Sequence, residues 1–272
     1  MQAEKPICLR LNGLGRQGIR YLETVREMNN VFFYESNITG GVVGAVIATP
    51  PTSHIDLAIT YLSEGLYVMI EKPVALSYED ASRIDGAKVL VNHTHLFAPA
   101  YERLKKLLVP PIVRIDISHH GPGPARDYSG LYDYGSHGVA MCLDLVGWEL
   151  RIHPGPDEVV AQKVDSDLFD VQIKWHTDRP VRAFLHVGSG TTEKRCWMRV
   201  QTATQIFEYD GLLGQLHLNG VVQEMEDERT PLNKAIGVFV DLIRGKSDPR
   251  AGMRLPMQVM AVLDAAQREI ER

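Results

Sequence analysis

The sequence has few cysteines, no long apolar run and no excess of positive charge. Its three cysteines, Cys8, Cys142 and Cys196, are far apart, and none belongs to a CxxC motif. An odd number of scattered cysteines argues against a disulfide framework or a cysteine-based zinc site and favours a reducing compartment. The longest weakly polar run, Gly40 to Pro51, is too short to cross a bilayer. The N-terminus shows no basic segment followed by an apolar one, so we expect a cytoplasmic protein with no signal peptide and no membrane partner.

The charge balance also narrows the class of partner. Lys and Arg number 29 against 34 Asp and Glu, which gives a net charge of -5. A protein that binds nucleic acid needs a basic surface to neutralise phosphates, so we expect no nucleic-acid partner. Hydrophobic residues make up 44% and charged residues 23% of the chain, as is typical of globular proteins. This composition is compatible with a small-molecule substrate.

The first third of the chain alternates between short apolar strands and helices. Strands are expected at 7–11, 31–34, 42–48, 66–70 and 89–92. Such alternation predicts a parallel sheet that helices cover on both faces. We therefore expect residues 1–95 to form a dinucleotide-binding domain of the Rossmann type within an α/β chain.

After Asn92 the pattern changes to the alternation of apolar and polar residues that is typical of antiparallel strands. Strands are expected at 112–118, 159–164, 169–175, 183–187, 196–201, 205–209 and 215–218. A Gly/Pro-rich loop at 120–128 leads to a helix expected from about Ser136 to Val146. Two helices close the chain and are candidates to pack back on the first domain. Residues 96–272 are thus expected to form an α+β domain.

A glycine-rich loop directly follows the first strand and opens the first helix. It consists of Gly13, Leu14, Gly15, Arg16, Gln17 and Gly18. In a G-x-G-x-x-G loop the first glycine permits a tight turn, the second lets the backbone approach a pyrophosphate, and the third lets helix and strand pack closely. The helix N-terminus then faces the phosphate charge. The loop predicts dinucleotide binding; the alternative is an ordinary strand–helix turn that happens to contain three glycines.

The end of the second strand bears on the choice between NAD and NADP. Glu35 is 17 residues after Gly18, close to where an acidic residue binds the adenosine ribose, and this favours NAD. Ser36 and Arg16 are candidates to contact a 2′-phosphate instead, which would favour NADP. Only residues 36–41 separate Glu35 from the next strand, fewer than a crossover helix needs. Either a bare loop makes this crossing or the adenine side of the sheet is shortened.

Four motifs in order resemble one enzyme family. They are the glycine loop, Ala48-Thr49-Pro50-Pro51-x-x-His54, Glu71-Lys72-Pro73 and Asp133-x-Gly135-x-His137. Together they are similar to the glucose-fructose oxidoreductase, inositol dehydrogenase and MocA (Gfo/Idh/MocA) family. The resemblance implies a Rossmann domain followed by a domain with an open, mostly antiparallel sheet that serves as a homo-oligomer interface. It also implies an enzyme that oxidises or reduces a hydroxyl carbon of a sugar, sugar derivative or cyclic polyol with NAD(P).

The resemblance assigns catalytic roles to Lys72, Asp133 and His137. Oxidation of a carbinol needs a base for the hydroxyl proton, and four residues of spacing place Asp133 and His137 on one helix face. If a helix begins near Ser136, its positive dipole end favours the neutral, proton-accepting form of His137. Lys72 follows a parallel strand, where ligands bind in such sheets. The alternatives are a solvated lysine, a core or capping histidine and a turn aspartate.

Further residues are expected to line the cofactor and the substrate. In the family, Thr49, Pro50 and His54 would line the nicotinamide side, Glu71 and Lys72 would bind the cofactor, and His95 would reach the substrate. A surface-loop histidine is an equal alternative for His95. Relatives often carry an acidic residue just after the motif histidine or a turn further on, where Gly138 and Ala140 stand here, so one substrate contact is expected to be absent.

The histidines at 93, 95, 119 and 120 also raise the question of a metal. No cysteine or carboxylate completes a recognisable zinc spacing, so we expect no metal. Two other functions stay open. A non-catalytic relative that binds a ligand or regulates is favoured by the shortened first domain and disfavoured by the intact Lys72, Asp133 and His137 set. A reductase of a non-sugar substrate such as a linear tetrapyrrole would need a more apolar pocket.

Overall fold

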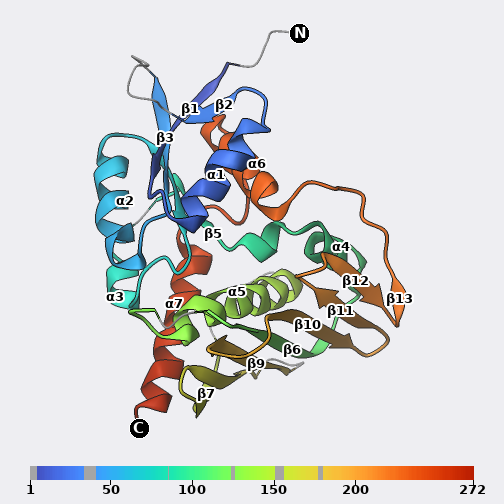
Figure 1. The fold of residues 1–272 in the computed structure, drawn as a ribbon. Coiled ribbons are helices and arrows are strands. Elements are labelled where there is room, and N and C mark those ends of the chain that lie inside the picture. Colours follow the sequence, from blue (N-terminus) through green and yellow to red (C-terminus); the bar gives the residue numbers. More distant parts are fainter. Residues whose placement is uncertain (1–4, 34–40, 85, 124–125, 151–155, 177–179) are drawn as a thin grey trace. The chain divides into compact units, whose positions relative to one another are not determined.

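The computed structural model describes residues 5–33, 41–84, 86–123, 126–150, 156–176 and 180–272, apart from the side chains of residues 148–150. The chain divides into two compact units. Unit 1 comprises Met1–Thr94 and Arg229–Met257, and unit 2 comprises His95–Glu228 and Gln258–Arg272. Figure 1 labels most of the helices and strands, numbered in chain order. Each unit contains one sheet.

Unit 1 contains a parallel sheet. Its strands are β1 (Ile7–Asn12), β2 (Val31–Phe33), β3 (Val42–Ile47), β4 (Tyr67–Glu71) and β5 (Val89–Asn92). They lie in the order β2-β1-β3-β4-β5, and every pair is parallel. All of β5 and all of β4 except Tyr67 are buried, as expected for strands covered on both faces. The predicted Rossmann-type sheet is confirmed.

Helices from both ends of the chain complete unit 1. They are α1 (Arg16–Arg26), the 3-10 turn η1 (Pro51–Ser53), α2 (His54–Ser63), α3 (Tyr78–Ala81) and α6 (Pro231–Ile243). α6 packs against α1 and buries Ile236 and Phe239. A backbone bridge between Leu90 and Ala251 adds a further link from the late chain to β5. The core of this unit therefore needs residues that follow the second sheet in the sequence.

The sheet of unit 1 is short on the side of β2. A dinucleotide-binding sheet usually has two strands on that side of the first one, whereas β2 is the edge strand in the described part of this chain. β2 itself has three residues. This agrees with the expectation of a shortened adenine side. Glu35 and Ser36, the residues expected to choose between NAD and NADP, lie outside the described residues.

Unit 2 contains a mostly antiparallel sheet. Its strands are β6 (Ile112–Gly121), β7 (Glu158–Asp165), β8 (Leu168–Trp175), β9 (Val181–Ser189), β10 (Arg195–Thr202), β11 (Ile206–Asp210), β12 (Gln215–Leu218) and β13 (Val221–Val222). They lie in the order β13-β12-β11-β10-β6-β9-β8-β7. Among the described strands of this sheet, only β6 and β9 pair in parallel. Every second residue of β8 is buried, so one face of the sheet is covered. The predicted fold class is confirmed.

Three helices and one 3-10 turn accompany this sheet. They are η2 (Thr94–Phe97), α4 (Pro99–Leu107), α5 (Gly130–Leu150) and α7 (Arg254–Ile270), whose first residues belong to unit 1. α5 packs on β9 and β6, where a Cβ at Gly138 would lie 3.0 Å from Leu185 Cδ2. Gly138 therefore faces the sheet and lets the helix approach closely. Among the described helices, none combines the length and the apolarity that a bilayer crossing requires.

Two expected boundaries are wrong, and both lie near the candidate site. The helix expected from Ser136 begins at Gly130, because the Gly130 N–H donates to Asp167 Oδ1 (2.7 Å) from the β7–β8 turn. The strand expected to end at Ser118 continues to Gly121, because pairing with β9 and β10 on both sides extends it. Partners distant in the sequence set both boundaries.

Candidate active site

The glycine loop of unit 1 has two structural glycines and one exposed glycine. Gly13 has φ +95°, and a Cβ there would lie 2.4 Å from the carbonyl oxygen of Ala48. A Cβ at Gly18 would lie 1.9 Å from the carbonyl oxygen of Gly13, so neither position admits a side chain. Gly15 precedes α1, receives no side-chain cap from the described residues, and has no atom within 4 Å of its Cβ direction. This arrangement fits a loop whose backbone is approached by a pyrophosphate at Gly15.

Glu71 anchors a buried network beneath this loop. Its Oε1 accepts hydrogen bonds from Tyr21 Oη (2.7 Å), Gln17 Nε2 (3.0 Å) and Asn92 Nδ2 (2.7 Å). The network joins α1, β4 and β5, and the carboxylate helps to raise the pKa of Tyr21, after burial as the main cause. Glu71 and Gln17 therefore position the loop and the end of β4. Contact of either with a cofactor stays a prediction.

His54 connects the loops that follow β3 and β4. Its Nε2 lies 2.8 Å from the carbonyl oxygen of Thr49, and its Nδ1 lies 3.0 Å from that of Pro73. The side chain is buried, and burial lowers its pKa even though both carbonyls favour the charged form. His54 thus fixes the Thr49–Pro50 turn relative to the turn that carries Lys72. The expected place of His54 on the nicotinamide side stays a prediction.

Lys72 directly follows β4 and precedes a cis peptide bond to Pro73. The neighbouring β5 ends at Asn92, and the next residue, His93, is buried. Among the described residues, no hydrogen-bond partner reaches either ring nitrogen of His93. Burial, together with the positive charge of Lys72, lowers the pKa of His93 to about 3. A neutral imidazole therefore lies within the electrostatic reach of Lys72, a neighbour that the sequence motifs did not indicate.

In unit 2, Asp133 and His137 lie on α5, four residues apart, as predicted. Both are buried, and Asp133 lies in the first turn of the helix. The proposed effect of the helix dipole on His137 is therefore wrong, because the helix begins seven residues before it. The guanidinium Nε of Arg126 lies 2.9 Å from Asp133 Oδ2. Arg126 precedes the helix in a loop that the sequence analysis treated only as Gly/Pro-rich.

Removal of Arg126 tests whether its ion pair matters for activity. We expect Arg126→Ala to lower turnover about tenfold and to leave NADH affinity unchanged, because a hydrogen bond to a charged group is worth about 1.5–3 kcal/mol when its partner is buried. Arg126→Lys should restore part of the rate. Arg114 offers a matched control, because its guanidinium pairs at 2.7 Å with Asp116 on β6 of the same unit, and Asp116 is not a candidate site residue. Equal rates in Arg126→Ala and Arg114→Ala would remove Arg126 from the site.

His137 belongs to a cluster of three imidazoles. The His95 ring centroid lies 4.9 Å from that of His137 and 5.3 Å from that of His119, and the His119 and His137 centroids are 5.2 Å apart. His95 Nδ1 lies 2.9 Å from Tyr209 Oη and pairs edge to face with its ring. Cys196 Sγ lies 3.4 Å from His95 Nε2, and burial raises the pKa of Cys196 to about 12. His95 is therefore half-buried in the cluster and is not a surface-loop residue.

The two halves of the predicted site belong to different units. Lys72, Thr49, Pro50, His54 and the glycine loop are in unit 1, and His95, Asp133 and His137 are in unit 2. Within each unit the predicted residues are close together. His93, Arg126 and Cys196 lie near these residues but were not predicted as active-site residues. Only His93 had a local signal, because it directly follows a strand end that the pattern predicted correctly.

Comparison with known proteins agrees with the glycine loop and the parallel sheet. Residues 9–89 match the model of a family described as "Oxidoreductase family, NAD-binding Rossmann fold". Oxidoreductase P35 of Formosa agariphila is 35% identical over 81 residues, which are 27% of this chain and 25% of that protein. The match thus spans about a quarter of the length of that relative.

Two solved structures share the fold over nearly the whole chain. UDP-N-acetylglucosamine 3-dehydrogenase GnnA from Acidithiobacillus ferrooxidans has a TM-score of 0.82 at 17% identity, covering 98% of this chain and 99% of that one. A myo-inositol dehydrogenase from Corynebacterium glutamicum has a TM-score of 0.74 at 15% identity, covering 98% and 97%. The predicted cofactor class, NAD or NADP, agrees with the family's NAD-binding domain. Residues 9–89 therefore match the NAD-binding Rossmann domain of the Gfo/Idh/MocA family of oxidoreductases, and the chain as a whole shares the fold of these two dehydrogenases.

Proposed function

We propose that this protein transfers a hydride between NAD(P) and a hydroxyl or keto carbon of a sugar, sugar derivative or cyclic polyol. The observation that carries the proposal is the position of Lys72 and the glycine loop at the carboxyl edge of one parallel sheet, after β4 and β1. Ligands of such sheets bind at this edge. β3 lies between β1 and β4 in the sheet, and His54 hydrogen-bonds to carbonyl oxygens of both the loop after β3 and the turn after Lys72.

The residues divide the chemistry between them. In the direction of oxidation, the substrate carbon loses a hydride and its oxygen loses a proton. Bound NAD(P) supplies the hydride acceptor. We assign two roles. A ring nitrogen of His137 accepts the proton, and the Lys72 ammonium donates a hydrogen bond to the substrate oxygen. Asp133, one helical turn before His137, stabilises the imidazolium that forms.

The choice of dinucleotide stays part of the proposal. Glu35 favours NAD through the adenosine ribose, and Arg16 is the described residue that would favour NADP. Arg16 begins α1 and is exposed, so it is accessible to a 2′-phosphate. Parallel titrations with NADH and NADPH distinguish the two assignments.

The first experiment titrates purified protein with each reduced cofactor and monitors binding by nicotinamide fluorescence. The second measures turnover of a panel of sugars, sugar nucleotides and inositols with the oxidised cofactor. The proposal expects saturable binding of one cofactor and turnover of at least one member of the panel. A folded sample that binds neither cofactor would contradict it and favour a non-catalytic relative. Binding without turnover of any panel member, but with reduction of an apolar conjugated substrate, would reassign the substrate class.

A further inference from the structure

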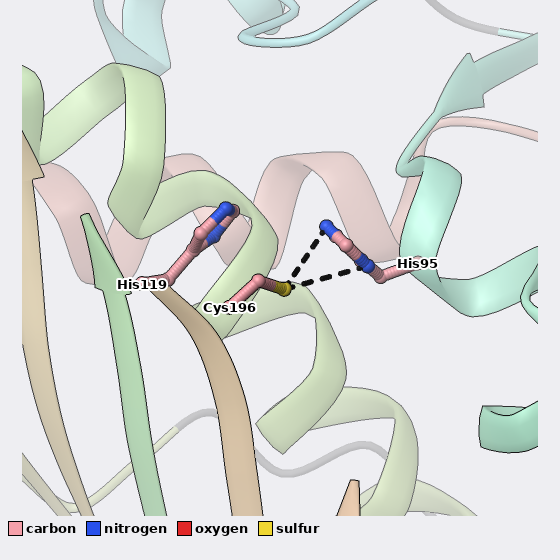
Figure 2. A group of neighbouring side chains, drawn as sticks. All are labelled: His95, His119 and Cys196. Carbon is pink, nitrogen blue, oxygen red and sulfur yellow. Dashed lines mark hydrogen bonds between the residues drawn. The ribbon is translucent and has the colours of Figure 1, made fainter. Parts of the chain in front are cut away.

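The imidazole cluster of unit 2 and the neighbouring Cys196 contain three side chains that could together hold a metal ion. His95 lies on η2, His119 on β6 and Cys196 on β10, and one ligand atom from each lies within 4.8 Å of the others. Figure 2 shows the three side chains converging from these three elements. His119 and Cys196 are directly opposed in the antiparallel β6–β10 ladder, so their side chains share one face of the sheet.

The separation of the ligand atoms suits a tetrahedral ion. Zn–S bonds of about 2.3 Å and Zn–N bonds of about 2.0–2.1 Å place S and N about 3.6 Å apart at a tetrahedral angle. The observed distance between Cys196 Sγ and His95 Nε2 is 3.4 Å. The other nitrogen of His95 faces Tyr209 Oη at 2.9 Å, a contact of the kind that orients metal-bound histidines and directs Nε2 to the ion.

The donor set and its burial select the class of metal. One thiolate and two imidazoles favour Zn²⁺ over Mg²⁺ or Ca²⁺, which prefer oxygen ligands. Cys196 and His119 are 3% and 6% exposed, so the protein would shield a bound ion from solvent on the side of these two residues. Gly211 closes the cluster near Cys196, because a Cβ there would lie 2.5 Å from Sγ.

We propose that His95, His119 and Cys196 form a binding site for Zn²⁺. Three protein ligands leave one coordination position for water, which is the arrangement of catalytic zinc sites more than of structural ones. The His137 ring lies 4.9 Å and 5.2 Å from the two histidine rings, so the ion would lie beside the base of the proposed reaction. The site goes beyond the proposed function, which uses His137 without a metal. The histidines raised the question of a metal in the sequence, but no zinc spacing along the chain includes Cys196, which is 101 residues from His95.

The test begins with tag-free protein that has been stripped with a chelator and dialysed. We expect one Zn²⁺ per chain by elemental analysis after reloading, and a cobalt-substituted protein with an intense visible spectrum and a thiolate-to-cobalt band in the near ultraviolet. Competition with a chromophoric chelator then gives the Zn²⁺ affinity. Wild-type protein that takes up no stoichiometric Zn²⁺, or a cobalt spectrum without the thiolate band, would overturn the proposal.

Matched variants identify the ligands. Cys196→Ala should abolish the thiolate band, and both Cys196→Ala and His119→Gln should lower Zn²⁺ affinity at least about 100-fold, since loss of an outer partner alone costs 10–100-fold. The controls are Cys142→Ala, a buried cysteine of α5, and His120→Gln, whose ring contacts Thr191 and His186. His120 follows His119 on β6 and faces the opposite side of the sheet. Equal affinity in ligand variants and controls would refute the site.

Loss of a metal ligand must be distinguished from unfolding and from loss of cofactor binding. Circular dichroism melts compare the folding of all variants, and His95→Gln replaces Cys196→Ala if the latter is unfolded. All metal titrations are made without nicotinamide cofactor. Failure of the metal site would then leave cofactor binding and turnover intact, whereas failure of the proposed function would leave the metal titrations unchanged.

Discussion

Replacement of Lys72 by alanine is expected to lower turnover about 10²–10⁴-fold while NADH still binds, the range typical for removal of a group that handles a proton or hydrogen bond in the transition state. Lys72 directly follows β4, where its ammonium would face the substrate oxygen. The glycine loop that would hold the dinucleotide follows a different strand, β1. The measurement is kcat and KM for the substrate found in the panel, beside a fluorescence titration with NADH.

Two controls separate chemistry from folding. Lys88 is an exposed lysine of the same unit, and its Nζ donates a hydrogen bond to the carbonyl oxygen of Gly65 (3.0 Å). Because Lys88 is not a candidate site residue, Lys88→Ala should leave turnover unchanged. The double variant Lys72→Ala/His137→Asn should lose little more than the worse single variant if both residues act on one substrate oxygen. Wild-type turnover by Lys72→Ala would end the assignment of Lys72. Fully additive losses would indicate that the two residues act separately.

The sequence predicted the elements of unit 1 well because its signals are local. A buried parallel strand reads as a continuous apolar run, and glycines and prolines mark its ends. The strand at 89–92 has the predicted limits, and the others differ by one or two residues. The start of α5 was missed because Asp167, 37 residues away, caps Gly130. Such a partner leaves no trace in the residues around Ser136.

The candidate site shows the same division between local and distant signals. Lys72, Asp133 and His137 stand in short motifs, so they were predicted directly. Cys196 was set aside because zinc spacing was sought along the chain, whereas the β6–β10 register places it opposite His119. His54 and Glu71 stand in the motifs too, yet their hydrogen bonds hold loops and helices in position. A motif therefore marks a residue from the local sequence, whereas the hydrogen bonds that the residue makes come from the fold.

The glycine loop allows cofactor binding and folding to be tested separately. Gly15 has φ -71°, and a Cβ there would meet no protein atom within 4 Å. Gly15→Ala should therefore change the free energy of unfolding by no more than about 0.5 kcal/mol, as exposed substitutions usually do. If the pyrophosphate approaches the backbone at this position, the added methyl group occupies its place. We expect the dissociation constant for NADH to rise at least about tenfold.

Gly18→Ala provides the opposite result from the same loop. Its Cβ would lie 1.9 Å from the carbonyl oxygen of Gly13, so the backbone must move. Overpacking of this kind costs about 1–3 kcal/mol, and the melting temperature should fall by several degrees. Denaturant unfolding and NADH titration of both variants give two independent readouts. If Gly15→Ala binds NADH as tightly as the unsubstituted protein, the loop is a structural turn and not a phosphate site. If Gly15→Ala alone loses affinity and Gly18→Ala alone loses stability, the two roles assigned to the loop belong to separate glycines.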